Sequence, residues 1–213
     1  MRKMKKLIMV LAAALMLAPA YLPAADEAAA PAKPKKKLQM KMYMNQLEKA
    51  KAEAVKNEAP ILVLVLLDGD EKSAMVKRFL LGNKLFKQFA QENFATLVLK
   101  GQKASKGGVV NTKSFKNWEF IEKNIMAEGT KSISDTADKL SFYPGAFFVS
   151  PDGEKKLADV PKYNPELGFG AWAMDVVARL EQGGISANVS PALKKAIENP
   201  QPDVKMSAAK KKK

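Results

Sequence analysis

Apolar residues recur every three to four positions in several stretches of the chain, which is the spacing of one face of a helix. The stretch that begins at Leu47 stops before Pro60, because a residue that precedes proline is biased away from the helical region. Gly82-Asn83 and Gly183-Gly184 mark two further helix ends. The pattern predicts helices near 47–55, 75–80, 85–89, 118–126 and 172–180, and a short one near 193–197.

Shorter apolar runs between these helices predict strands. Ile61–Leu67 is an uninterrupted apolar run, which is typical of a strand that is covered on both faces at the centre of a parallel sheet. Residues 101–113 are rich in Gly, Lys and Ser and predict a loop. Further strands are expected at 94–99, 146–149 and 154–158, with the last two joined as a hairpin by Pro151-Asp152-Gly153. The sequence therefore predicts an α/β three-layer sandwich with a central mixed sheet flanked by helices.

The N-terminus has the pattern of an export signal. Basic residues between Arg2 and Lys6 precede the apolar run Leu7–Leu17, and small residues suitable for cleavage follow at Ala18-Pro19-Ala20 or near Ala25. We therefore expect residues 1–25 to be a signal peptide. No later apolar run approaches about 20 residues, so we expect a soluble periplasmic or secreted protein.

Basic residues are concentrated at the two ends of the chain. The formal charge is +14, yet residues 38–200 hold 23 of the 36 basic and 19 of the 22 acidic residues, which leaves about +4. This charge is too weak to argue for specific nucleic-acid binding. We expect residues 26–37 to be a disordered Ala/Pro/Lys linker, 38–185 the folded domain, and 186–213 an extension with a basic tail. The tail is interpreted as solvated, with weak contact to an anionic surface as the alternative.

The chain contains neither cysteine nor histidine. Thiol, disulfide and histidine-based chemistry are therefore excluded for its own side chains, and we interpret it as a binding protein rather than an enzyme, with no cofactor or metal. Asp68, Asp70 and Glu71 could hold a cation or form a general acid/base pair, but we favour caps of a helix N-terminus. Ser73 is a conceivable nucleophile only if a desolvated Lys72 served as its base, and we do not favour catalysis.

Two further groups of residues have alternative interpretations. The methionines at 40, 42 and 44 alternate with polar or aromatic residues, and we favour an edge strand over a copper site of thioethers. Trp118, Phe142 and Tyr143 could line a peptide groove, but aromatic side chains at helix and strand positions are favoured as core.

The element order and four segments resemble the thioredoxin fold, in particular exported thioredoxin-like proteins. The resemblance covers Leu47 to Leu180. It is carried by Ala59-Pro60-Ile61-Leu62-Val63, by the segment from Asp68 to Ala74, by Phe142-Tyr143-Pro144-Gly145-Ala146-Phe147-Phe148, and by Ser150-Pro151-Asp152-Gly153-Glu154.

The resemblance implies a specific loss of activity. Counting back from Phe86 places Glu71 and Ala74 where the family has its two cysteines, so neither the nucleophilic nor the resolving sulfur is present. The family also implies a cis peptide bond before Pro144, next to a backbone edge that receives extended peptides. The implied peptide groove consists of Asp70, Glu71, Ser73, Ala74, Tyr143, Pro144 and Gly145.

We therefore expect an exported, redox-inactive thioredoxin-like domain that binds extended polypeptide or another envelope protein without covalent chemistry. The alternative is a structural or interaction protein of the cell envelope that is held by its basic tails.

Overall fold

The computed structural model describes residues 38–39, 41–103, 110–125 and 145–204. Its strands form one mixed sheet in the order β1-β3-β2-β5-β6, and the short β4 pairs with β3. β1, β2 and β3 are parallel, whereas β4, β5 and β6 run antiparallel to the strands they pair with. The strands are β1 (Met42–Met44), β2 (Ile61–Asp68), β3 (Ala95–Lys103), β4 (Val110–Asn111), β5 (Gly145–Val149) and β6 (Lys156–Asp159).

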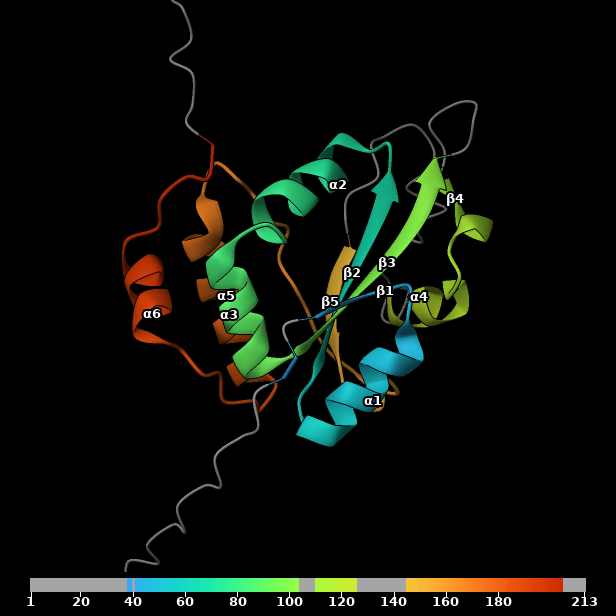
Figure 1. The fold of residues 1–213 in the computed structure, drawn as a ribbon, viewed down its shortest axis with the longest axis horizontal. Coiled ribbons are helices and arrows are strands. Elements are labelled where there is room, and N and C mark those ends of the chain that lie inside the picture. Colours follow the sequence, from blue (N-terminus) through green and yellow to red (C-terminus); the bar gives the residue numbers. More distant parts are fainter. Residues whose placement is uncertain (1–37, 40, 104–109, 126–144, 205–213) are drawn as a thin grey trace, which may run out of the picture. The chain divides into compact units, whose positions relative to one another are not determined.

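Helices cover both faces of this sheet (Figure 1). α1 (Leu47–Asn57) and α4 (Trp118–Ile125) contribute to one hydrophobic core cluster. The other cluster, which also contains strand residues, takes its helical residues from η1, α3, α5 and α6. These elements are α2 (Glu71–Met75), the π-helix η1 (Val76–Leu80), α3 (Lys84–Asn93), the 3₁₀ turn η2 (Thr112–Ser114), α5 (Gly168–Gln182) and α6 (Pro191–Glu198). The expected three-layer α/β architecture is confirmed.

Strand β2 shows why the central apolar run is uninterrupted. Successive side chains of a strand point to opposite faces of the sheet. Ile61, Val63, Val65 and Leu67 enter the core under α1 and α4, whereas Leu62, Leu64 and Leu66 enter the opposite core. β2 pairs with β3 on one side and with β5 on the other, so it is the interior strand that the sequence predicted.

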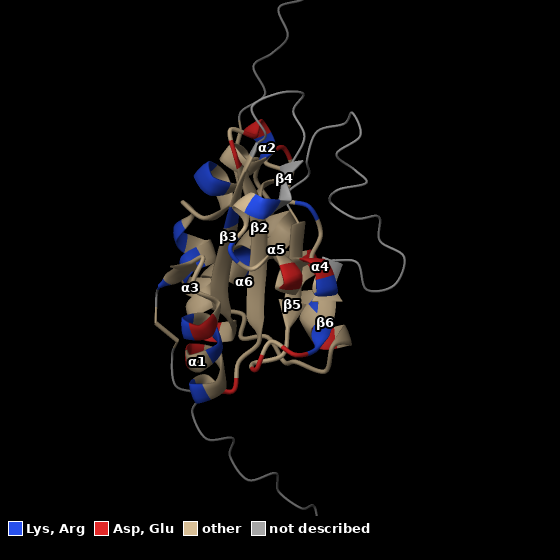
Figure 2. Cartoon of the chain, turned by 90° about the vertical axis from the view of Figure 1, so that its right-hand side faces the viewer, with Lys and Arg blue, Asp and Glu red and all other residues tan. Residues whose placement is uncertain are grey.

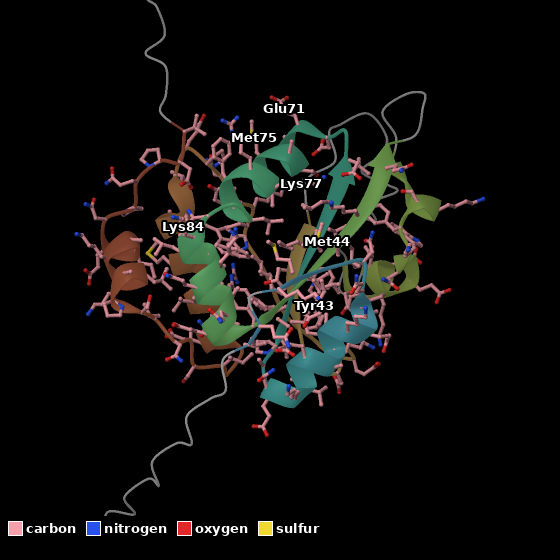
Figure 3. All side chains as sticks on the ribbon, in the orientation of Figure 1. Tyr43, Met44, Glu71, Met75, Lys77 and Lys84 are labelled. Atoms are coloured by element: carbon pink, nitrogen blue, oxygen red, sulfur yellow. The ribbon has the colours of Figure 1, made fainter. Side chains whose placement is uncertain are left out.

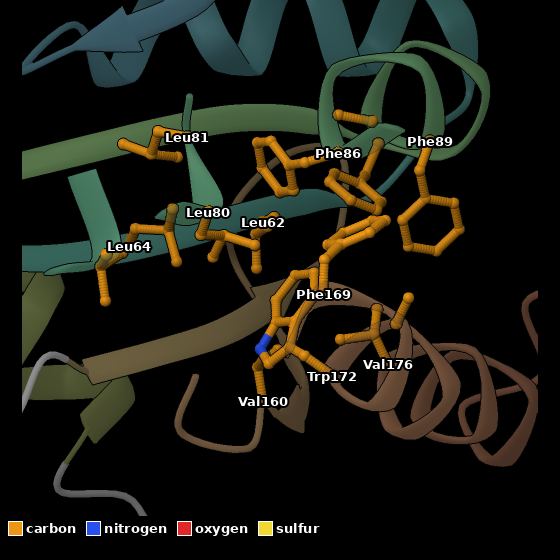
Figure 4. Close-up of a cluster of buried hydrophobic side chains, with 14 of the residues drawn as sticks. Leu62, Leu64, Leu80, Leu81, Phe86, Phe89, Val160, Phe169, Trp172 and Val176 are labelled. Carbon is orange, nitrogen blue, oxygen red and sulfur yellow. The ribbon is translucent and has the colours of Figure 1, made fainter. Parts of the chain in front are cut away.

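The second core is dominated by aromatic rings (Figure 4). The ring centroids of Phe86 and Trp172 lie 5.9 Å apart, and those of Phe94 and Phe148 lie 5.3 Å apart. Trp172 Nε1 donates a hydrogen bond of 3.1 Å to the carbonyl of Pro161, which satisfies the polar atom of a buried indole. These contacts fix α3 and α5 against the same face of the sheet.

Two predicted boundaries are wrong. The loop expected at 101–113 is partly regular, because β3 continues to Lys103 and β4 and η2 follow. Gly101 permits this, since a Cβ there would lie only 2.1 Å from the ring of Phe115. The strand expected at 154–158 begins at Lys156 instead. The main chains of Ser150 and Lys155 already close the turn, with Ser150 N–H donating to the Lys155 carbonyl at 2.8 Å.

The segment that follows residue 185 contains a packed helix. Leu193 of α6 is buried in the second core, and Ser190 Oγ accepts from the Leu193 N–H at 3.3 Å as an N-cap. Asn93 of α3 holds the segment that connects α5 to α6, because its side-chain amide exchanges two hydrogen bonds with the main chain of Asn188. None of the helices in the described ranges is both long and apolar enough to cross a membrane.

Candidate functional site

The candidate site begins where β2 ends and α2 starts. Asp68 is the last residue of β2, and Gly69 turns the chain with a φ of +79°, a conformation that glycine adopts without steric cost. Asp70 is extended and buried, and its Oδ2 accepts a hydrogen bond of 2.7 Å from the Ser73 N–H. The capping interpretation of Asp70 is therefore confirmed.

Ser73 is fully buried beneath the start of this helix. Its Oγ accepts a hydrogen bond of 3.0 Å from the Leu67 N–H, which joins α2 to the end of β2. Because the Ser73 hydroxyl is buried and accepts a hydrogen bond from the main chain, its role here is structural. This geometry gives no support to the hypothesis that Ser73 is a nucleophile. Within the described residues, no group of three or more Asp, Glu, Cys or His side chains could hold a metal ion.

Glu71 and Ala74, the positions that the family resemblance assigns to the lost cysteines, are both exposed. Figure 3 shows Glu71 and Met75 on the outer side of α2. Lys77 of η1 forms an ion pair with Asp68, which connects the helix to the end of β2 a second time. The helix start is thus firmly anchored, and its surface presents the Glu71 carboxylate and the Ala74 methyl group.

Gly145 lies at the same end of the sheet as this helix start. It pairs with Val65 in the β2–β5 ladder, three residues before Asp68. On the other side of β5, the pairing with β6 is continued by a hydrogen bond of 2.9 Å from the Val160 N–H to the Ala146 carbonyl. Pro161 follows and has no N–H with which to continue that ladder. The groove residues Tyr143 and Pro144, and Phe142 beside them, lie outside the described residues.

The other candidate residues lie elsewhere in the fold. Met42 and Met44 belong to β1, which pairs with β3, so the strand interpretation is confirmed for them, while Met40 lies outside the described residues. Trp118 packs on Phe115 with ring centroids 5.8 Å apart, partly buried at the edge of the first core. Together with Phe120 and Lys113 these rings border an open cavity of about 540 Å³.

Sequence reasoning missed two features of the region. One is the π-helical turn η1, seen in the Leu81 N–H to Val76 carbonyl hydrogen bond of 3.0 Å; such turns are frequent at functional sites. The other is the absence of any Asp or Glu from residues 72–91, a signal that the sequence itself contains.

No protein-family model matches the chain, and no curated protein matches it. Among solved structures, a chain described as "DsbH Oxidoreductase" is similar at a TM-score of 0.43 and 17% sequence identity, covering 74% of this chain and 96% of that chain. The fold is an α/β sandwich with the features that the sequence predicted from its resemblance to the thioredoxin fold: the element order, the mixed sheet, the β5–β6 hairpin and the closing helix α5.

Proposed function

We propose that this chain is an exported, redox-inactive thioredoxin-like protein that captures extended polypeptide without covalent chemistry. The binding groove in this proposal lies between the helix start at Asp70–Ala74 and the segment Tyr143-Pro144-Gly145. The polypeptide is an unfolded segment or part of another envelope protein.

One observation carries the proposal. The start of α2 is held in place by buried hydrogen bonds, yet the two positions at which the family resemblance predicts cysteine hold other residues. Asp70 caps the helix and Ser73 Oγ binds the Leu67 N–H, so the loop is held in place by buried hydrogen bonds. Glu71 and Ala74 are exposed beside it. A scaffold preserved without its reactive sulfurs is suited to contact rather than to disulfide exchange.

The adjacent sheet edge supports main-chain recognition. β6 covers β5 only as far as Ala146, and Pro161 cannot donate beyond that point. An extended segment can add to such an edge through its backbone, which tolerates many sequences. Because no covalent trap holds the segment, we expect weak affinity, on the order of micromolar to millimolar.

Replacing Ala74 with arginine tests the groove directly. The long side chain would stand over the helix start, so Ala74→Arg should weaken binding of reduced, carboxymethylated α-lactalbumin at least about fivefold, or roughly 1 kcal/mol. Fluorescence anisotropy with the labelled probe measures this affinity. Ala52→Arg is the matched control, because Ala52 is also an exposed helical alanine and the charge change is the same.

The control and a tail deletion separate the two functions. Ala52→Arg and a chain that ends at Val204 should bind as the full chain does. Equal binding by Ala74→Arg and the full chain would contradict the groove. Loss of binding on removal of the lysine tail would favour the envelope protein held by its basic ends.

A further inference from the structure

A basic surface extends from the candidate groove along the neighbouring helices. Residues 72–91 contain five Lys or Arg and no Asp or Glu. They form most of α2, all of η1 and most of α3, and Figure 2 shows the Lys and Arg positions along these helices. Lys77 forms an ion pair with Asp68, whereas Arg78, Lys84 and Lys87 form no ion pair with any described residue. We call these three residues the basic face.

The basic face continues directly from the groove. Ala74 and Arg78 are four residues apart, so they lie on one side of the helix, and both are exposed. Exposed Lys84 opens α3 after the turn at Gly82, and partly exposed Lys87 follows one turn later. Arg78 thus follows Ala74 on one side of the helix, and the two exposed or partly exposed lysines follow in the first turn of α3.

The acidic residues around this surface lie at its margins. Glu71 stands at the helix start, Asp68 is paired with Lys77, and Glu92 lies in the last turn of α3. Between Arg78 and Lys87 the sequence carries only basic charged residues. Asp203, which lines a pocket together with Asn83 and Leu85, accepts a hydrogen bond from the Tyr163 hydroxyl.

Apolar exposure on this surface is small. Met75 and Phe79 are partly buried, and the Arg78 guanidinium lies 5.1 Å from the centroid of the Phe79 ring. The large apolar side chains that the described residues expose lie on other elements: Met44, Val55, Leu167, Met174 and Val189. Stable insertion into a lipid surface requires an extended apolar face that is exposed, and this surface offers only the partly buried Met75 and Phe79.

We propose that the basic face selects acidic polypeptide: Asp or Glu side chains of the segment held in the groove lie over Arg78, Lys84 and Lys87. This inference rests on the proposed function and adds the chemistry of the ligand. Carboxylates pair with guanidinium and ammonium groups, and the three cations would gain ion-pair partners that the described residues do not supply.

Charge-neutralising variants test this selectivity in the full chain. The probe is a labelled peptide of alternating Glu and Ser, compared at low salt with its Gln counterpart. The full chain should bind the Glu peptide about tenfold more tightly than the Gln peptide, because three surface ion pairs each contribute a fraction of a kcal/mol to binding. The triple variant Arg78→Gln, Lys84→Gln, Lys87→Gln should lose most of that preference.

A second triple variant controls for net charge. Lys49→Gln, Lys56→Gln, Lys113→Gln removes the same charge from exposed positions on α1 and η2, and it should keep the preference. Equal losses in both triple variants, or no preference in the full chain, would overturn the inference. The inference would also be overturned if the variant Arg78→Gln, Lys84→Gln, Lys87→Gln lost binding to phosphatidylglycerol vesicles but kept its preference for the Glu peptide. If the preference fails while Ala74→Arg still weakens binding of the Gln peptide, the groove stands and only its acidic selectivity is wrong.

Discussion

Asp70 and Ser73 shape the candidate site through two hydrogen bonds, one within the first turn of α2 and one between α2 and the preceding strand β2. The Asp70 cap closes within one helical turn, so an acid before an apolar helical pattern was enough to predict it. The bond from Leu67 N–H to Ser73 Oγ joins a helix to the preceding strand, and it could not be predicted because the packing of α2 on β2 decides it. The exposure of Glu71 and Ala74 depends on the same packing.

Removal of the Asp70 carboxylate should destabilise the fold. Asp70→Ala leaves the Ser73 N–H without its buried acceptor and is expected to lower the free energy of unfolding by about 1 kcal/mol. Urea denaturation followed by circular dichroism measures the change. Asp70→Asn keeps a side-chain oxygen and should retain most of the stability, whereas equal losses in both variants would argue against a capping role.

Introducing two cysteines tests the alignment that the family resemblance implies. In Glu71→Cys with Ala74→Cys, the two residues are three apart in the first turn of α2, so their side chains lie close enough for a disulfide. Mild oxidation should remove both free thiols, as counted with a thiol reagent before and after reduction, while each single variant keeps its thiol. Two thiols that stay free in the double variant would place the lost cysteine site elsewhere in the chain.

At the scale of elements, local patterns predicted which helices and strands exist but not all of their limits. The apolar period of α5 was visible from Trp172 onward, whereas the helix begins at Gly168. That start depends on the close approach of α6 and the segment after it. A Cβ at Gly170 would lie 2.0 Å from the Ala196 carbonyl oxygen, and one at Gly168 would lie 1.8 Å from that of Gln201. A contact between residues distant in sequence also explains why β3 is longer than its apolar run, because the ring of Phe115 packs against Gly101.

The contact between α5 and α6 predicts an unusual effect of alanine. Replacing a helical glycine with alanine ordinarily stabilises a helix by roughly 0.5–1 kcal/mol. Gly170→Ala should instead lower the thermal midpoint, because its methyl group would overlap the Ala196 carbonyl of α6. Gly183→Ala is the control, since its Cβ would stay 3.3 Å from the nearest atom. A raised midpoint in Gly170→Ala would contradict this packing.

The whole molecule joins elements that lie far apart in sequence into one site. The sheet order β1-β3-β2-β5-β6 brings Gly145 next to Val65 and thus to the end of β2, where α2 begins. The order of helices and strands in the sequence was enough to predict the layers and the hairpin, because connections in such folds are short and right-handed. Strand register was not predictable, because it depends on how Phe147 and Phe148 of β5 pair with the neighbouring strand β2 within the sheet.

The central claim is that this surface of the molecule captures extended polypeptide. An NMR titration of isotope-labelled full chain with reduced, carboxymethylated α-lactalbumin tests it most directly, because each amide reports its own surroundings. We predict that the amides of Ser73 and Gly145 shift first and saturate together, with an affinity on the order of micromolar to millimolar. Shifts confined to the lysine-rich ends, with Ser73 and Gly145 unchanged at saturation, would contradict the account.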